Sequence, residues 1–212
     1  MNTVIIAVFA LVAVLHLAAA FLEIQPLRKV TKIFLVPLLL LYYCLNTRTF
    51  LVPVLLAAVF GWLGDCCLIK ISDKRFFIAG LFSFLLGHIF YIPSMLFFTG
   101  SVNILWLVVS VLAGIAFGIV TIKTVKPDKP MLVPAIAYVV VILLMSITAL
   151  QLLLFRKDFA AAVIFAGSLC FMISDYILAR FTFSSLPKRG NFYIMLPYIL
   201  AQTCILYGLS LC

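Results

Sequence analysis

The chain has 212 residues, of which 67% are hydrophobic and only 10% are charged, and its mean hydropathy is +1.35. These values lie far outside the usage of water-soluble globular proteins, and a disordered chain would need the opposite bias. The formal net charge of +9 would suit a nucleic-acid-binding protein, but most of the cations gather between apolar runs. The composition therefore predicts an integral membrane protein.

Apolar runs follow one another along the whole chain, and each is near the roughly 20 residues that an α-helix needs to cross a bilayer. The eight runs are 3–22, 31–46, 50–69, 76–98, 102–121, 131–154, 158–179 and 191–211. Because the connections are short, we expect a single integral membrane domain of residues 1–212, folded as an all-α bundle of eight transmembrane helices. The first run ends in three alanines, as some signal peptides do, but no basic residue precedes it, so we expect a retained helix.

The basic residues alternate along the chain. The first, third, fifth and seventh connections carry 12 of the 15 cations. Because short cytoplasmic loops accumulate Lys and Arg, these connections are expected in the cytoplasm and both termini on the other side. A basic rim against anionic lipid explains the net charge without nucleic acid. The pattern fits a bacterial inner membrane and an endoplasmic reticulum membrane, and the compactness of the chain favours the bacterial one.

Metal and nucleophile chemistry find little support in the sequence. The six cysteines lie in or at the ends of predicted spans without a C-x-x-C pair, so we assign them no disulfide or metal role. Catalytic zinc typically has three protein ligands, whereas the chain has only His16 and His88, on different helices. We expect no metal or other cofactor, and His16 is interpreted as structural. No serine stands in a G-x-S-x-G context.

Two carboxyl groups lie inside predicted spans, Asp65 and Asp175. Each is followed five residues later by a cation, Lys70 or Arg180, which places both carboxyls roughly 7 to 8 Å inside the cytoplasmic helix ends. Such a group costs roughly 2.5–3.5 kcal/mol to insert, so it usually faces the protein interior or a wet cavity. The spacing suggests a four-plus-four parallel pseudo-repeat in which the two aspartates face each other. The alternative is that each only hydrogen-bonds neighbouring helices.

Further polar side chains within the spans are candidates to position a substrate. His88 and Tyr91 share a helix face at i, i+3. His88 lies roughly 18 Å along its helix, deeper than the aspartates, which argues for an indirect or structural role unless helix tilt or a kink at Pro93 closes the difference. Tyr138 lies nearer the carboxyl level, and Tyr198 and Gln202 share a face at i, i+4. Hydrogen bonding between helices would explain each of them equally.

Lys32 is expected at the level of the cytoplasmic headgroups. Its ammonium could bind a substrate phosphate there. A lysine that extends from a helix end toward the headgroups would occupy the same place.

Several short motifs occur in one order along the chain, and together they resemble a known family. They are Thr31-Lys32, Gly64-Asp65-x-x-Leu68, His88-x-x-Tyr91, Pro134-x-x-x-Tyr138, Ser174-Asp175 and Pro197-Tyr198-x-x-Ala201-Gln202. In kind and order they are similar to those of the YhhN-type lysoplasmalogenases, over nearly the whole chain. One departure is Ile33, since the family often has proline after Thr-Lys.

The resemblance implies an ether-bond hydrolase that cleaves the vinyl ether of a lysoplasmalogen to a fatty aldehyde and a glycerophosphoethanolamine or glycerophosphocholine. This chemistry needs an acid to protonate carbon and an anion to stabilise the oxocarbenium ion, as in glycosidases. We therefore predict Asp65 and Asp175 as a coupled catalytic pair. The expected partners are a lysophospholipid substrate and membrane lipids. The substrate-binding candidates are His88, Tyr91, Tyr138, Tyr198, Gln202 and Lys32.

Two other functions fit parts of the sequence. A proton-coupled transporter could use the Asp65 and Asp175 carboxyls, and many carriers are built from repeats. A noncatalytic lipid-binding protein would leave both carboxyls unexplained.

Overall fold

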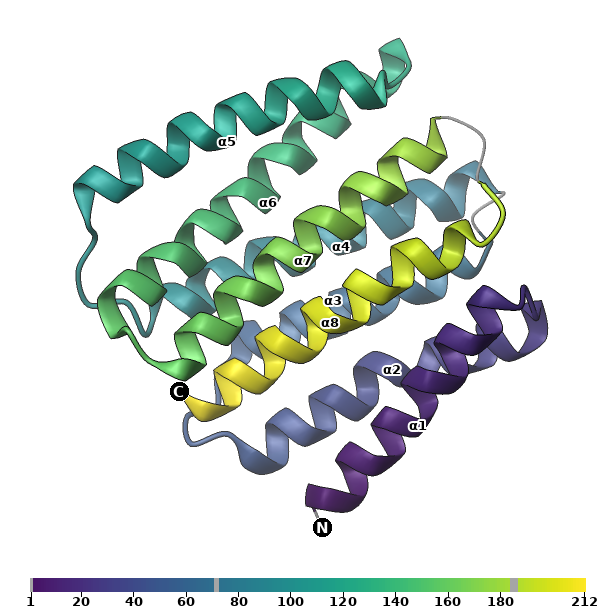
Figure 1. Cartoon of the computed structure of the whole chain (residues 1–212), viewed down its shortest axis with the longest axis horizontal. Helices are drawn as coiled ribbons and strands as arrows, with labels where there is room; N and C mark the ends of the chain where they lie inside the picture. The colour runs from purple at the N-terminus through teal and green to yellow at the C-terminus, as the bar shows by residue number, and fades with distance from the viewer. Residues whose placement is uncertain (1, 71–72, 184–186) are drawn as a thin grey trace.

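The computed structural model describes residues 2–70, 73–183 and 187–212, which form a bundle of long α-helices (Figure 1). All eight helices are long and apolar enough to cross a membrane, so the predicted all-α bundle with eight spans is confirmed. One turn of 3-10 helix, Leu68–Lys70, continues α3. The helices are α1 (Asn2–Phe21), α2 (Gln25–Asn46), α3 (Val52–Cys67), α4 (Lys74–Leu96), α5 (Ile104–Val125), α6 (Lys129–Arg156), α7 (Phe159–Thr182) and α8 (Gly190–Leu211).

Several helices extend beyond their apolar runs at the end where the odd-numbered connections lie, and two of them, α2 and α7, carry candidate site residues. α2 begins at Gln25, six residues before its run, because a proline in the first turn favours a helix start. α7 continues to Thr182, three residues past its run. At 1.5 Å per residue, Lys32 and Asp175 therefore each lie about 10 Å inside the ends of their helices. Both side chains are deeper in the bundle than the apolar runs alone predicted.

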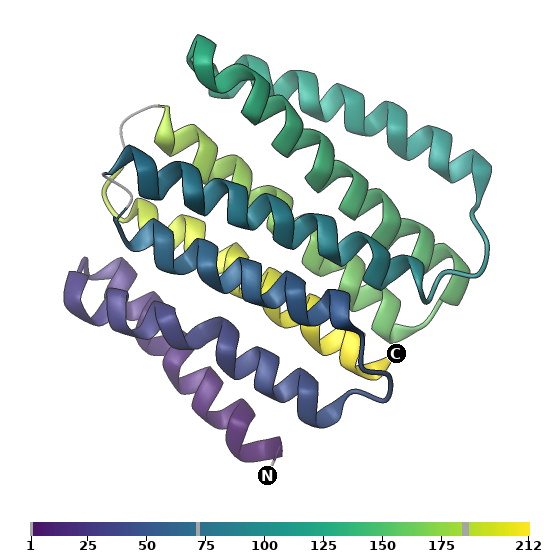
Figure 2. The ribbon, with the colours of Figure 1, turned by 180° about the vertical axis from the view of Figure 1, so that it is seen from behind.

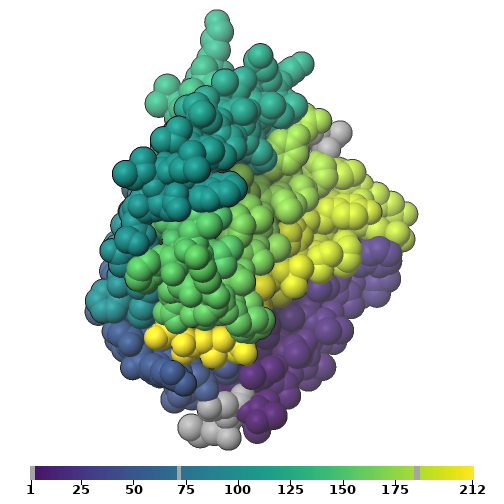
Figure 3. Space-filling view, turned by 60° about the vertical axis from the view of Figure 1, so that its left-hand side comes forward, coloured from purple at the N-terminus to yellow at the C-terminus, as the bar shows by residue number. Residues whose placement is uncertain are grey.

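The helices are arranged so that α1 and α5 lie at opposite edges of the bundle in both ribbon views (Figures 1 and 2). In the space-filling view α7 and α8, green and yellow, lie between α5, in teal, and α1, in purple (Figure 3). The two termini lie at the same end of the bundle (Figures 1 and 2), as an even number of antiparallel spans requires. The side of the membrane that this end faces, and the internal repeat, stay predictions.

The α3–α4 and α7–α8 hairpins pack with their backbones close together. A Cβ atom added at Gly87 of α4 would lie 3.1 Å from the carbonyl oxygen of Ala57 in α3. One added at Gly208 of α8 would lie 2.9 Å from the carbonyl oxygen of Ala160 in α7. Small residues permit such approach between transmembrane helices, where packing rather than water exclusion drives association. These two tight hairpins carry Asp65, on α3, and Asp175, on α7.

Asp158 caps the N-terminus of α7 just outside the span. Its Oδ1 accepts a hydrogen bond from the backbone N–H of Ala161 at 2.9 Å, and Arg156 Nη2 lies 2.7 Å from its Oδ2. Partial burial would raise the pKa of Asp158, but the Ala161 amide and the Arg156 guanidinium together hold the pKa of this carboxyl below its usual value. The cap therefore fixes the start of the helix that carries Asp175.

Candidate functional site

The carboxyl of Asp175, on α7, contacts side chains of α4 and α6. The hydroxyl of Tyr138, from α6, donates a hydrogen bond of 2.8 Å to Asp175 Oδ2. Nε2 of His88, from α4, lies 3.1 Å from the same oxygen and 3.2 Å from the Tyr138 hydroxyl. Among the described residues no hydrogen bond to Oδ1 of Asp175 is found. One carboxyl oxygen is thus held by two side chains while the other is left for a further partner.

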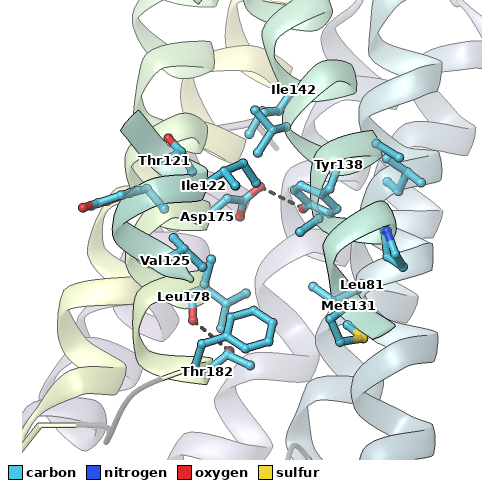
Figure 4. A pocket seen from close by; sticks show the side chains of 18 of the residues that line it. Leu81, Thr121, Ile122, Val125, Met131, Tyr138, Ile142, Asp175, Leu178 and Thr182 are labelled. Carbon is cyan, nitrogen blue, oxygen red and sulfur yellow. Dashed lines mark hydrogen bonds between the residues drawn. The ribbon is translucent and has the colours of Figure 1, made fainter. Parts of the chain in front are cut away.

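A cavity of about 520 Å³ opens beside this carboxyl, enclosed by α4, α5, α6 and α7. Figure 4 shows Asp175 and Tyr138 on its wall, joined by their hydrogen bond, among side chains that are mainly apolar. The Asp175 side chain is 14% exposed, whereas His88 behind it is only 2% exposed. Lys74, the first residue of α4, lies at the end of the cavity where the odd-numbered connections gather. The cavity combines an apolar lining with a carboxyl and a hydroxyl deep inside.

Asp65 lies in a second polar cluster, which is almost completely buried. Lys32 Nζ of α2 forms an ion pair with Asp65 Oδ1 at 3.2 Å, and the two side chains are 7% and 1% exposed. The Tyr198 hydroxyl of α8 donates a hydrogen bond of 2.6 Å to Asp65 Oδ2. Gln202 donates through Nε2 to the Tyr198 hydroxyl at 3.3 Å and accepts at Oε1 from the Tyr91 hydroxyl at 2.9 Å. This chain of contacts joins α2, α3, α4 and α8.

The buried ring of Phe171 on α7 contacts both clusters. Its centroid lies 4.9 Å from that of His88 in an edge-to-face contact, and 5.8 Å from that of Tyr198. The ring of Tyr91 lies 6.4 Å away. Sequence reasoning missed Phe171, because one phenylalanine in an apolar helix gives no signal that separates it from ordinary core residues. It supplies the packing that sets the two clusters side by side.

The structure brings every predicted site residue into one of the two clusters, but it divides the predicted aspartate pair. Within the part of the chain that the structure describes, Asp65 and Asp175 share none of their ion-pair or hydrogen-bond partners. Of the eight candidates, only Asp175 and Tyr138 line the cavity. His88 and Tyr91, although three residues apart on one face, contribute to different clusters.

Two expectations about individual residues need correction. Lys32 is buried and paired with Asp65 rather than placed at the headgroup level, because α2 begins six residues earlier than its apolar run. His88 contacts Asp175 directly, although its depth argued for an indirect role. Part of that apparent mismatch disappears because α7 continues to Thr182. His16 is fully buried with Nδ1 2.9 Å from the Thr31 hydroxyl, which fits the structural interpretation.

The arrangement at Asp175 allows proton transfer. Across residues 2–70, 73–183 and 187–212, no three His, Cys, Asp or Glu side chains gather as metal ligands would. Asp175 can exchange a proton at Oδ1 with a molecule in the cavity, while Tyr138 and His88 fix the orientation of its other oxygen.

Compared with known proteins, the chain matches the model of the YhhN family over residues 27–209, which is most of its length. No curated protein and no solved structure matches it. The matched region includes both polar clusters and the four helices that enclose the cavity.

Proposed function

The chain belongs to the YhhN family, and on that premise we propose that it is a lysoplasmalogenase-type hydrolase. Its reaction would cleave the vinyl ether of a lysoplasmalogen to a fatty aldehyde and glycerophosphoethanolamine or glycerophosphocholine. The observation that supports this most is the place of Asp175: a carboxyl on the wall of an apolar cavity of about 520 Å³ within membrane-spanning helices. Such a cavity suits the part of a lipid around its vinyl ether, and the carboxyl suits acid catalysis next to it.

The reaction begins with a proton on carbon. In a vinyl ether, the ether oxygen pushes electron density onto the β-carbon of the double bond, so an acid protonates that carbon and leaves an oxocarbenium ion. Water then adds to the cationic carbon and loses a proton, which gives a hemiacetal. The hemiacetal collapses to the aldehyde and releases the glycerol oxygen as an alcohol. One water is consumed, and the catalytic acid is regenerated.

Asp175 is placed to serve at both proton-transfer steps. In its acid form it delivers the proton from Oδ1. As a carboxylate it stabilises the neighbouring oxocarbenium ion and accepts the proton of the attacking water. Tyr138 and His88 hold Oδ2 at 2.8 and 3.1 Å, so little reorganisation of the carboxyl is needed as its charge changes. Tyr138 also lines the cavity and can contact the substrate.

Asp65 has a different role in this proposal. It is 1% exposed and paired with Lys32, so it does not reach a molecule in the cavity. We assign it, with Tyr198 and Gln202, to holding α2, α3, α4 and α8 around the core on which His88 and Phe171 pack. The mechanism with two catalytic carboxyls that the sequence predicted is replaced in this proposal by one in which a single carboxyl contacts the substrate.

The headgroup end of the substrate would lie toward Lys74. Asp175 is seven residues from the end of α7 at Thr182, or about 10 Å along the helix axis. That distance leaves room for a glycerophosphate group between the carboxyl and Lys74, whose ammonium is suited to a phosphate oxygen. If the odd-numbered connections are cytoplasmic, lipid enters from the cytoplasmic leaflet.

Solvent deuterium provides the sharpest test of this chemistry. Purified protein would be incubated with a lysoplasmalogen in D2O, and the released aldehyde would be analysed by mass spectrometry. Protonation of the β-carbon places one solvent deuterium on the carbon next to the aldehyde group. A lysophospholipid with an ester in place of the vinyl ether serves as control and should release no aldehyde. Aldehyde without deuterium at that carbon would exclude the mechanism, and no aldehyde from folded protein would exclude the function and favour proton-coupled transport.

A further inference from the structure

A second apolar cavity adjoins the first. Its volume is about 420 Å³, and α5, α6 and α7 line it with side chains that include Trp106, Leu150 and Phe165. Two residues, Phe117 of α5 and Met172 of α7, line both cavities. The two spaces therefore meet at a shared wall made by these side chains.

The second cavity continues the first away from the headgroup end. On α7 it reaches from Met172 back to Phe165, which is about 10 Å at 1.5 Å per residue. On α5 it reaches from Phe117 back to Trp106, about 16 Å. Both helices run toward the odd-numbered connections, so these residues lie on the opposite side of the shared wall from Lys74.

The first cavity is too shallow beyond Asp175 to hold a long hydrocarbon chain. Along α7 the carboxyl is only three residues, or about 4.5 Å, from Met172 at the shared wall. A substrate with its vinyl ether at Asp175 and its headgroup toward Lys74 must therefore direct its chain to the wall. The hydrocarbon chain then either turns sideways into the surrounding lipid or passes between Phe117 and Met172 into the second cavity.

We propose that the second cavity receives the distal part of the alkenyl chain, and that Phe117 and Met172 determine which chain lengths the enzyme accepts. The inference rests on the proposed function and adds a specificity determinant to it. The second cavity is apolar and continuous with the site of the carboxyl through two shared residues, which favours the substrate's own chain over a separate lipid. Because lipid is as apolar as the cavity, discrimination comes from steric fit rather than from water exclusion.

Variants of α5 test the steric part of the proposal. Ala113 lines the second cavity, whereas Ala116, one turn further on and also exposed to lipid, lines neither. Ala113→Phe should lower the rate on long-chain relative to short-chain lysoplasmalogens by roughly 5- to 150-fold, because its ring would take space that the bound chain needs, as an oversized side chain does in a packed core. Ala116→Phe should leave that ratio unchanged. Equal chain-length profiles for both variants and wild type would overturn the proposal.

Removing a side chain from the shared wall should have the opposite effect on the preferred chain length. Phe117→Ala should move the preferred alkenyl chain to greater length, while Ile115→Ala, a lipid-facing control on the same helix, should not. An unchanged preference in Phe117→Ala would count against the proposal even if Ala113→Phe behaves as expected, because the wall residues would then set no limit.

A binding measurement separates this inference from the proposed function. A non-hydrolysable lysophospholipid with a diazirine at the chain end would be irradiated with the protein, and the cross-linked residues mapped. Cross-links in residues 143–150 and 165–172 that are lost in Ala113→Phe support the second cavity without any turnover. Cross-links spread over α1 and over Leu112, Ile115 and Ile119 of α5, which line neither cavity, and unaffected by that substitution would overturn it, even if wild type releases aldehyde. Cross-links in the cavity without aldehyde would remove only the proposed function.

Discussion

Removing the ammonium of Lys32 should destabilise the protein strongly, because the carboxylate of Asp65 would remain buried without its cation. The two side chains are 7% and 1% exposed, and their charged atoms lie 3.2 Å apart. Breaking such a buried pair by removing one partner costs about 3–5 kcal/mol, whereas replacing both partners by uncharged residues of similar shape is often neutral. Lys32→Met and Asp65→Asn should each be destabilised, and the double variant should recover most of the loss.

The loss of stability in each variant can be measured by thermal unfolding of the purified protein. For a chain of this size, each kcal/mol shifts the midpoint by roughly 2–4 °C, so each single variant should unfold roughly 6–20 °C below wild type. The coupling energy from the double-mutant cycle should be opposite in sign to the single losses. Additive losses would refute the ion pair as the source of the effect.

Aldehyde release from the same four proteins separates packing from chemistry. If Asp65 acts only by holding the helices, the double variant should regain activity together with stability. A double variant that is as stable as wild type but releases no aldehyde would show that Asp65 or Lys32 takes part in the reaction, and would contradict a purely structural role for the pair.

Three further predictions follow from single contacts. Tyr138→Phe removes the hydroxyl that donates to Asp175, and steady-state kinetics should show kcat lower by roughly 10- to 150-fold, since a hydrogen bond to a charged group is worth about 1.5–3 kcal/mol; unchanged kcat would contradict the role. Gly208→Ala places a methyl 2.9 Å from the Ala160 carbonyl oxygen and should cost about 1–3 kcal/mol in unfolding measurements. Asp158→Ala removes the α7 cap and should cost about 1 kcal/mol at neutral pH. The folded-state pKa of Asp158 is below its usual value, so the stability that the cap contributes is present above the unfolded-state pKa and is lost as the pH falls through the folded-state pKa. A difference in the free energy of unfolding between wild type and Asp158→Ala that grows in acid would contradict this.

The number and length of the helices could be predicted because the bilayer sets both. Runs of about 20 apolar residues separated by short polar connections leave few other folds. The ends were less predictable: Gln25 to Val30 form the first turns of α2 with several polar residues, so hydropathy alone placed the helix start too late. That error put Lys32 at the membrane surface instead of beside Asp65.

The members of the candidate site could be predicted because a polar side chain within a membrane span needs a partner. Which of these side chains bind one another could not be predicted, since this depends on how each helix is rotated and tilted against its neighbours. His88 and Tyr91 illustrate this: they share a face in sequence, yet one binds Asp175 and the other Gln202. Phe171, which packs on both clusters, carries no sequence signal because the apolar spans contain many similar residues.

The role of Asp175 as the carboxyl that contacts the substrate can be tested by comparing aldehyde release from a lysoplasmalogen by wild type, Asp175→Asn and Asp158→Asn. Both substitutions change an aspartate associated with α7, but only Asp175 lines the cavity, and asparagine preserves the helix cap at residue 158. We expect equal aldehyde release from wild type and Asp158→Asn, and none above background from a folded Asp175→Asn protein. Wild-type activity in Asp175→Asn would contradict it.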